Sequence, residues 1–114
     1  MRLEKLGVLN KIELVDLELL DITNIINVII KVKPEAIYNL AAQSFVDLSF
    51  EQPVFTSEVN AVGVTRILEA IKTVNPKIKF YQASTSEMFG NNISHLLNEN
   101  TPFYPKSPYG ASKL

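Results

Sequence analysis

The sequence contains no cysteine and a single histidine, which excludes disulfide scaffolds, zinc ribbons, thiol nucleophiles and histidine-rich metal sites. Basic and acidic residues nearly balance, 11 Lys and Arg against 12 Asp and Glu, so the net charge of −1 points to neither nucleic acid nor an anionic membrane as a partner. No run approaches the roughly 20 apolar residues of a membrane span, and the first residues lack a secretory signal pattern, so we expect a cytoplasmic protein. Any chemistry must use hydroxyls, carboxylates, Lys and a bound cofactor.

Strand and helix patterns alternate along the 114 residues. We expect strands at 12–17, 36–42 and 78–83, a helix between the first two, a second helix over 53–74, and a third from Ser107-Pro108, where Ser suits an N-cap and Pro the first turn. The order predicts an α/β fold, a partial Rossmann-type doubly wound parallel sheet in three layers, α/β/α. Polar clusters follow each expected strand, and in such sheets the carboxyl ends of the strands border the ligand crevice.

Apolar residues at three- and four-residue spacing define one face of each of the first two predicted helices. In the first helix these are Leu19, Ile22, Ile25, Ile26, Ile29 and Ile30, and in the second Val54, Phe55, Val59, Val62, Ile67, Leu68 and Ile71. Polar and Pro residues dominate 90–107, which predicts a long surface loop. We interpret His95, within that loop, as a surface residue without a catalytic part.

Tyr109 and Lys113 form a Tyr-x-x-x-Lys spacing, which places both side chains on one face of the last predicted helix. A Lys ammonium beside a Tyr phenol stabilises the phenolate and lets it act as a base near neutral pH. Thr85 and Glu87, at the end of the preceding strand, would complete a set of hydroxyl, carboxylate and phenol. Taken alone, the Tyr and Lys spacing also occurs by chance, and the Thr85 to Glu87 cluster is equally typical of a helix cap or turn.

Four phrases together resemble the extended short-chain dehydrogenase/reductase superfamily, and within it the GDP-mannose 4,6-dehydratase family. They are YNLAAQSFV (38–46), SFEQPVFTSEVNAVGVTRILEAI (49–71), FYQASTSEMFG (80–90) and TPFYPKSPYGASKL (101–114). Related epimerases usually have a small residue where this chain has Glu87, and glucose-nucleotide dehydratases typically have Asp where it has Ser86. Both departures favour the mannose-nucleotide branch.

The resemblance implies a lyase that converts GDP-mannose to GDP-4-keto-6-deoxymannose and water, in nucleotide-sugar biosynthesis, with internal hydride transfer from C4 to C6. It implies that Tyr109 takes the proton of the C4 hydroxyl, that Glu87 removes the C5 proton and assists loss of the C6 hydroxyl, and that Thr85 binds at C4. Lys113 matches the residue that contacts the nicotinamide ribose and tunes Tyr109. The family implies a homo-oligomer and NADP as cofactor; NAD stays open, because the segment that decides between them is absent.

The resemblance also implies catalytic and cofactor-binding residues, by position in the sequence. The catalytic set implied is Thr85, Glu87, Tyr109 and Lys113, and the cofactor-binding set is Asp16, Leu17, Leu40, Ala41, Ala42, Gln43, Ser44, Phe55, Tyr109 and Lys113. Asp16 and Leu17 match the pair that flanks the adenine, and the small residues after the second strand let the dinucleotide approach. Phe55 stands where some members have Tyr, and Phe45 where His is common.

The family normally opens with a strand and a G-x-x-G-x-x-G turn, and this chain has only four glycines and no such motif. We therefore expect residues 1–114 to be a partial NAD(P)-binding Rossmann domain, truncated at both ends, without the first strands and the substrate domain, and inactive alone. Two alternatives remain: another nucleotide-sugar epimerase or dehydratase, and a non-catalytic remnant of the family.

Overall fold

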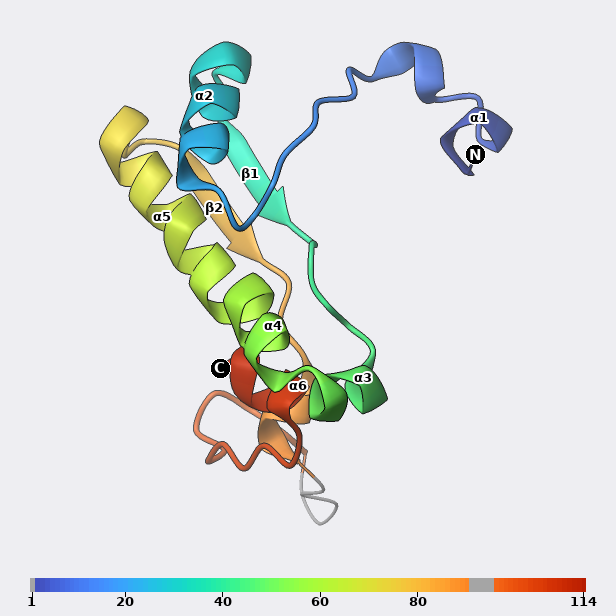
Figure 1. Cartoon of the computed structure of the whole chain (residues 1–114), viewed down its shortest axis with the longest axis vertical. Coiled ribbons are helices and arrows are strands. Elements are labelled where there is room, and N and C mark those ends of the chain that lie inside the picture. Colours follow the sequence, from blue (N-terminus) through green and yellow to red (C-terminus); the bar gives the residue numbers. More distant parts are fainter. Residues whose placement is uncertain (1, 91–95) are drawn as a thin grey trace.

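The computed structural model describes residues 2–90 and 96–114 of the chain (Figure 1). The two strands are β1 (Ala36–Asn39) and β2 (Lys79–Gln82). The α-helices are α1 (Arg2–Lys5), α2 (Ile22–Val32), α3 (Val46–Glu51), α4 (Pro53–Ser57), α5 (Gly63–Val74) and α6 (Pro108–Ser112), and three short turns of helix are η1 (Leu9–Lys11), the π-helical η2 (Glu58–Val62) and η3 (Ser86–Phe89). Within the described residues no helix is long and apolar enough to cross a membrane.

The two strands pair in parallel, with Ile37 opposite Phe80 and Tyr38 opposite Tyr81. Ile37 and Phe80 pack against the apolar core, whereas the two tyrosines point to the other face, where their ring centroids lie 5.8 Å apart. Helices α2 and α5 pack on each other and cover the core face of the sheet (Figure 1). The structure confirms the parallel α/β arrangement with a helical crossover between the strands. Of the two helical layers predicted on either face of the sheet, the described helices over these strands form the one on the core face.

Helix α2 begins where Asp21 caps it. The Asp21 carboxylate accepts hydrogen bonds from the backbone N–H groups of Thr23 (2.8 Å) and Asn24 (3.2 Å), two donors that the first turn leaves unsatisfied. The helix ends at Lys33, whose φ of 50° is left-handed. The prediction is correct at the end of this helix, before Pro34, but the helix begins at Ile22, so Leu19 lies before it. Of the predicted face, Ile25 and Ile29 are buried in the core, whereas Ile22 and Ile30 are 37% and 52% exposed. The core as a whole consists of Leu19, Ile25, Ile29, Ile67, Ala70, Ile71 and Ile78.

The predicted strand at 12–17 is wrong, because in the structure this segment belongs to no helix or strand. It runs as an extended arm from α1 and η1 toward α2 (Figure 1). Local preference for extended backbone is only half of what a strand needs, because a strand also requires a hydrogen-bonding partner. In the described sheet β1 pairs only with β2, and the arm pairs with neither. The other two predicted strands are present but shorter, 36–39 and 79–82.

The predicted apolar face of the second long helix is only partly correct: Val59 packs against the core, but Val62 and Leu68 are 38% and 45% exposed. Ile67 and Ile71 are buried, whereas Val54 is 75% exposed and Phe55 46% exposed. On α4 and η2 the buried positions are Thr56 and Asn60 instead, 0% and 3% exposed. Over its first half the helix therefore turns Thr56 and Asn60 inward, where α4 and η2 meet α6, while Val59 still packs against the apolar core.

Two further features concern the loop and α3. The described part of the predicted loop, 96–107, contains no helix or strand, in agreement with the prediction, while His95 lies outside the described residues.

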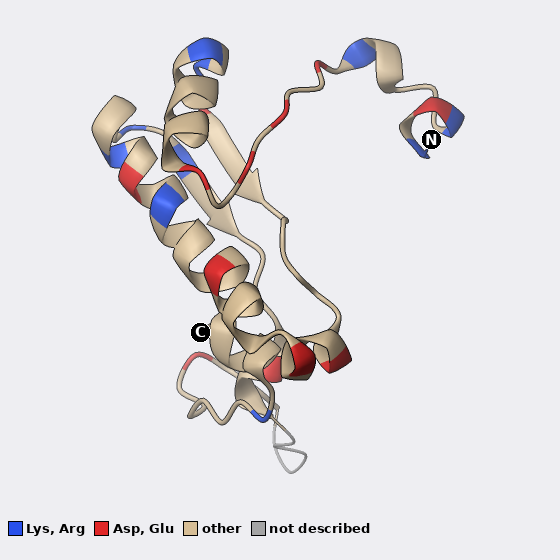
Figure 2. Cartoon of the chain, viewed as in Figure 1, with Lys and Arg blue, Asp and Glu red and all other residues tan. Residues whose placement is uncertain are grey.

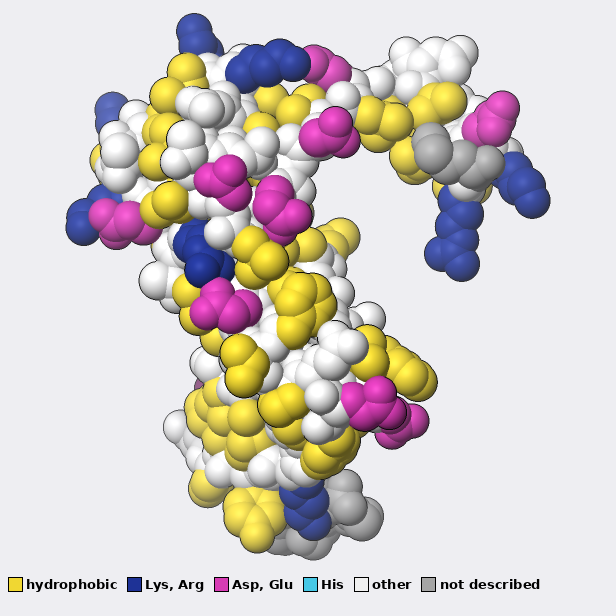
Figure 3. Space-filling view, in the orientation of Figure 1, with side chains coloured by type: hydrophobic (Ala, Val, Ile, Leu, Met, Phe, Trp, Pro, Cys, Tyr) yellow, Lys and Arg dark blue, Asp and Glu magenta, His cyan; other side chains and the backbone are white. Residues whose placement is uncertain are grey.

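Helix α3 was not predicted. Exposed apolar side chains of α3 and α4, including Phe50 (59% exposed), give the lower part of the molecule an apolar surface (Figure 3). Acidic and basic residues occur together on α5, whereas the charged residues on the arm between η1 and α2 are all acidic (Figure 2).

Replacing Ile25 by Ala is expected to lower the free energy of unfolding by about 2–5 kcal/mol, because Ile25 is fully buried and a cavity would remain. The matched control is Ile30→Ala in the same helix, where the side chain is 52% exposed and the loss should stay below about 1 kcal/mol. Urea unfolding followed by far-ultraviolet circular dichroism measures both. Equal losses in the two variants would show that α2 does not pack as described.

Candidate active site

The carboxyl ends of β1 and β2 lie at the same edge of the sheet because the strands are parallel. At the last rung the buried Asn39 donates from Nδ2 to Oε1 of Gln82 (2.8 Å), and its backbone carbonyl accepts from Ala83 N (3.0 Å). Gln82 in turn donates from Nε2 to the carbonyl of Ala83 (3.0 Å). One side-chain bond and one backbone bond thus fix the two strand ends relative to each other, and the chain leaves the sheet after each of them.

Lys113 reaches this edge from the end of α6. Its Nζ donates to the carbonyl oxygen of Ala83 at 2.8 Å, so the same carbonyl receives Gln82 and Lys113. Partial burial lowers the pKa of Lys113, because desolvation disfavours the charged ammonium. An ammonium offers three donors, and Ala83 occupies one of them. Lys113 is therefore held at the strand end with donors left for a ligand.

Thr85 and Glu87 occupy the turn that follows β2. The Thr85 hydroxyl oxygen accepts from the backbone N–H of Glu87 at 3.2 Å and so caps η3. This is the capping arrangement that the sequence left open, and it leaves the Thr85 O–H proton available as a donor. The Glu87 side chain is exposed to solvent. Capping and a role at a substrate are compatible here, since they use different parts of the hydroxyl group.

Helix α6 packs directly on η3, which brings Tyr109 and Lys113 to the segment that holds Thr85 and Glu87. The contact is close at Gly110: a Cβ on this residue would lie 2.7 Å from the backbone carbonyl oxygen of Glu87. Tyr109 precedes this glycine and is half-buried, one helical turn before Lys113. The structure therefore brings the four predicted catalytic residues together around one junction of α6, η3 and the end of β2.

The buried side chain of Asn60 links this junction to the chain after β1. Its Oδ1 accepts from Gln43 N (2.8 Å), and its Nδ2 donates both to the Gln43 carbonyl (2.9 Å) and to Ser112 Oγ (3.0 Å). Gln43 and Ser112 thus share one amide, which lies in the π-helical turn η2. Insertions of this kind into a helix occur frequently at functional sites. The sequence analysis did not single out Asn60, because one polar residue inside an apolar periodic segment gives no pattern.

A family model described as "GDP-mannose 4,6 dehydratase" matches residues 2–114 of the chain. The chain belongs to this family. A human protein named GDP-mannose 4,6 dehydratase is 50% identical over 99 residues, which are 85% of this chain and 27% of the human protein. The chain spans 25–28% of the length of the curated GDP-mannose 4,6-dehydratases that it matches.

Solved structures of similar fold carry nicotinamide cofactors. The UDP-glucose 4-epimerase of Thermus thermophilus, in complex with NAD, is 32% identical with a TM-score of 0.76, over 85% of this chain and 32% of that one. The protein RMD of Pseudomonas aeruginosa, in complex with NADPH, is 25% identical with a TM-score of 0.77, over 87% of this chain and 33% of that one. The Rossmann-type fold predicted for this member of the dehydratase family is thereby confirmed.

The structure places the predicted cofactor residues of the dehydratase family in three groups. Residues 40–44 leave β1 at the edge described above, and there Leu40 is 71% exposed while the side-chain oxygen Oε1 of Gln43 is buried without a hydrogen-bond partner among the described residues. Asp16 and Leu17 are exposed on the arm before α2, and no hydrogen bond between described residues ties them to the catalytic four. Phe55 lies on α4 and is also exposed. The first group is tied to the junction of α6 and η3 by the bonds between Gln43 and Asn60, and α4, which carries the exposed Phe55, packs on α6.

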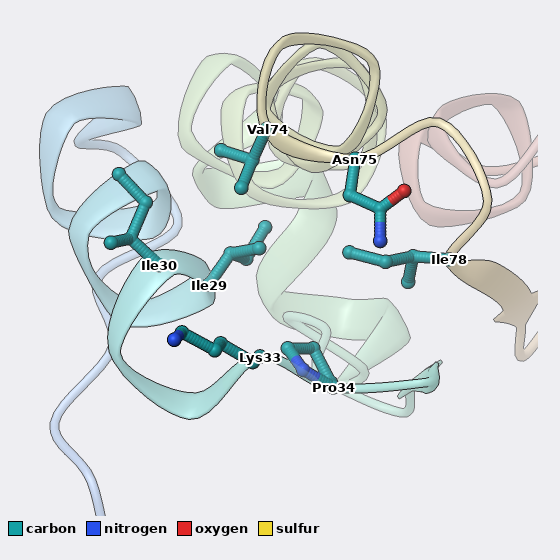
Figure 4. A pocket seen from close by; sticks show the side chains of 7 residues that line it. All are labelled: Ile29, Ile30, Lys33, Pro34, Val74, Asn75 and Ile78. Carbon is teal, nitrogen blue, oxygen red and sulfur yellow. The ribbon is translucent and has the colours of Figure 1, made fainter.

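A separate pocket of about 300 Å³ opens at the opposite end of the sheet (Figure 4). Ile29, Val74 and Ile78 form apolar walls between the ends of α2 and α5 and the start of β2, with Lys33 beside them. It contains none of the residues that the dehydratase family resemblance assigns. The candidate site is therefore the polar edge at the carboxyl ends of the strands and not this pocket.

Replacing Gly110 by Ala is expected to destabilise the chain by about 1–3 kcal/mol, because a backbone carbonyl cannot move aside as a flexible side chain can. The gain in helix propensity, about 1 kcal/mol, works in the other direction and is outweighed. Gly63→Ala is the matched control: its Cβ would meet Leu19 Cβ at 3.4 Å, an ordinary contact. Thermal unfolding ranks the two variants. A Gly110 variant as stable as the Gly63 variant would contradict the close approach of α6 and η3.

Replacing Asn60 by Asp is expected to lower the unfolding free energy by about 2–4 kcal/mol, since the carboxylate loses both donors and faces the Gln43 carbonyl. Asn75→Asp serves as the control, because Asn75 is exposed and its Oδ1 only accepts, from Lys77 N at 3.1 Å, a bond that Asp keeps. Chemical denaturation at pH 7 measures both losses. If the Asn60 variant loses no more than the control, the described bridge between Gln43 and Ser112 is wrong.

Proposed function

We propose that this chain forms the catalytic edge of a GDP-mannose 4,6-dehydratase, a lyase that converts GDP-mannose to GDP-4-keto-6-deoxymannose and water. The observation that carries the proposal is the packing of α6 on η3, which brings Tyr109 in α6 and Lys113 after it to the segment that holds Thr85 and Glu87. The family match and the 50% identity to a human protein of that name support the choice of nucleotide sugar.

Tyr109 acts as the base in the first step: its phenolate Oη takes the proton of the C4 hydroxyl while that carbon is oxidised to a ketone. The ammonium of Lys113, one turn further along α6, favours the phenolate, and the free O–H of Thr85 donates to the oxygen at C4. Both roles need the groups on one side of the substrate. The packing of α6 on η3 supports this arrangement.

Glu87 serves as base and then acid in the elimination. The ketone at C4 acidifies the C5 proton, and the Glu87 carboxylate removes it. The carboxylic acid formed in that step is the donor that the departing C6 hydroxyl needs in order to leave as water. The exposed position of Glu87 on η3 suits this use, since a carboxylate must reach two neighbouring carbons of a bound sugar.

The residues present fit a nicotinamide dinucleotide. When bound, such a cofactor would accept a hydride from C4 and, after water is lost, return it to C6 as C5 is protonated, so the overall reaction has no net oxidation. Lys113 Nζ has donors free for a ribose hydroxyl, and Gln43 Oε1 is an acceptor without a hydrogen-bond partner among the described residues. We propose NADP rather than NAD; a solved neighbour in complex with NADPH supports this choice, and another in complex with NAD shows that the fold takes either. The homo-oligomer that the resemblance implies stays a prediction.

A chimera tests the proposed activity. The 99 residues of a curated GDP-mannose 4,6-dehydratase that match this chain are replaced by those of this chain, and conversion of GDP-mannose to the 4-keto-6-deoxy sugar is assayed with NADP and with NAD. We expect turnover with GDP-mannose. Tyr109→Phe and Glu87→Gln should each lower kcat by at least about 100-fold, the usual contribution of a general acid or base.

Tyr104→Phe and Glu51→Gln are the matched controls, because both residues are exposed and belong to neither the catalytic nor the cofactor set. They should leave kcat within about twofold. Turnover of UDP-glucose but not GDP-mannose would replace the proposal by an epimerase. A folded chimera inactive on every nucleotide sugar would favour the non-catalytic reading.

A further inference from the structure

Helix α6 contains Tyr109 and is followed directly by Lys113, yet it has only five residues and cannot be stable alone. Its position must come from bonds to other elements. The backbone donors of a first helical turn have no acceptors inside the helix, so each needs an outside partner. Counting these donors in α6 shows where the helix is attached.

Three of the four positions are served locally. Pro108 has no N–H, the Gly110 N–H donates to Ser107 Oγ at 3.0 Å, and the Ala111 N–H donates to the Ser107 carbonyl at 2.9 Å. The remaining donor is the backbone N–H of Tyr109. Its acceptor is Oγ of Ser49 at 3.1 Å, from helix α3, 60 residues earlier in the chain.

Ser49 is built to accept this bond. Its side chain is 0% exposed, and its hydroxyl proton is committed to the Val46 carbonyl at 2.6 Å within α3. With the proton held there, the lone pairs of Oγ are directed toward α6. Because this position is fully buried, no water molecule could take the place of the Ser49 hydroxyl as acceptor unless the surrounding side chains moved.

The carbonyl of Tyr109 is held as firmly as its N–H. Ser112 Oγ donates to this carbonyl at 2.8 Å and itself accepts from Asn60 Nδ2 at 3.0 Å. Both backbone polar groups of Tyr109 therefore end on serine hydroxyls, and each hydroxyl is oriented by a partner on α3 or η2. Two bonds at opposite ends of one residue restrict rotation of that residue more than either does alone.

We propose that Ser49 is a positioning residue for Tyr109: its buried hydroxyl fixes the backbone of Tyr109 from α3 and thereby sets the place of the phenol relative to Glu87 and Lys113. This rests on the proposed function only in naming Tyr109 as the group that acts on substrate. The bond itself, and the effect of breaking it on α6, do not depend on which substrate the site takes.

The test compares Ser49→Ala with Thr56→Val in the 114-residue chain. Thr56 is the matched control because it is also 0% exposed, and its hydroxyl donates only within its own helical segment, to the Gln52 carbonyl at 2.8 Å. The readouts are hydrogen exchange of the Tyr109 amide and the pKa of Lys113, both followed by nuclear magnetic resonance.

Ser49→Ala should speed exchange of the Tyr109 amide about tenfold or more relative to core amides, the effect of losing one hydrogen bond. It should also raise the pKa of Lys113 toward its ordinary value, because a displaced α6 exposes the ammonium that burial now disfavours. Thr56→Val should change neither readout, even if it lowers overall stability. A general loss of stability would move both variants alike, so this pattern separates positioning from a merely structural role.

Two results would overturn the proposal. One is a Ser49→Ala variant that folds with the Tyr109 amide and the Lys113 pKa unchanged. The other, decisive if that variant does not fold, is a Tyr109 amide in the unaltered chain that exchanges as fast as an unbonded, exposed amide. In the chimera described above, Ser49→Ala should lower kcat about tenfold with little change in KM. A chimera without activity on GDP-mannose would refute the proposed function and leave the exchange result standing.

Discussion

The amide of Asn60 is the constraint on which the candidate site depends. It binds the backbone of Gln43 through both N–H and C=O and also binds Ser112. In this way one buried side chain connects the exit of β1, the long helical segment and α6. Each such bond contributes only about 1 kcal/mol to stability, but an unmet donor or acceptor in a buried place costs more. The geometry with all bonds formed is therefore preferred over any shifted arrangement of these three segments.

The parallel sheet supplies the second constraint. Because β1 and β2 run in the same direction, the polar residues that follow them emerge together, and the pair Asn39 and Gln82 locks the last rung. The Ala83 carbonyl then accepts a hydrogen bond from Lys113, which fixes the position of this ammonium relative to the strand ends. The parallel sheet determines where the candidate catalytic residues lie, while the short polar segments that follow the strands determine how their side chains are oriented.

Much of this arrangement could be predicted from the sequence. Apolar periodicity located α2, and Ser107-Pro108 located α6, where Ser107 Oγ accepts from Gly110 N as an N-cap should. The strand at 12–17 was wrong because residue preference does not reveal whether a partner strand is present. Helix α3 escaped prediction because six residues, VDLSFE, are too few to establish a period. The resemblance placed Tyr109, Lys113, Thr85 and Glu87 without their contacts, which lie between residues up to 60 positions apart.

The error on α4 and η2 has a physical meaning for the site. Apolar periodicity predicted that Val54 and Phe55 face inward, yet the inward face is Thr56 and Asn60. An apolar face would pack against α6 without direction, since burial of apolar surface is not directional. The hydrogen bond from Asn60 to Ser112 of α6 is directional and fixes rotation as well as distance, while Gly110 lets α6 approach Glu87 closely. A five-residue helix that must hold the Tyr109 phenol, and the Lys113 ammonium that follows it, in fixed positions needs both close approach and directional bonds. The interface between α6 and the first half of the long helix is therefore polar rather than apolar.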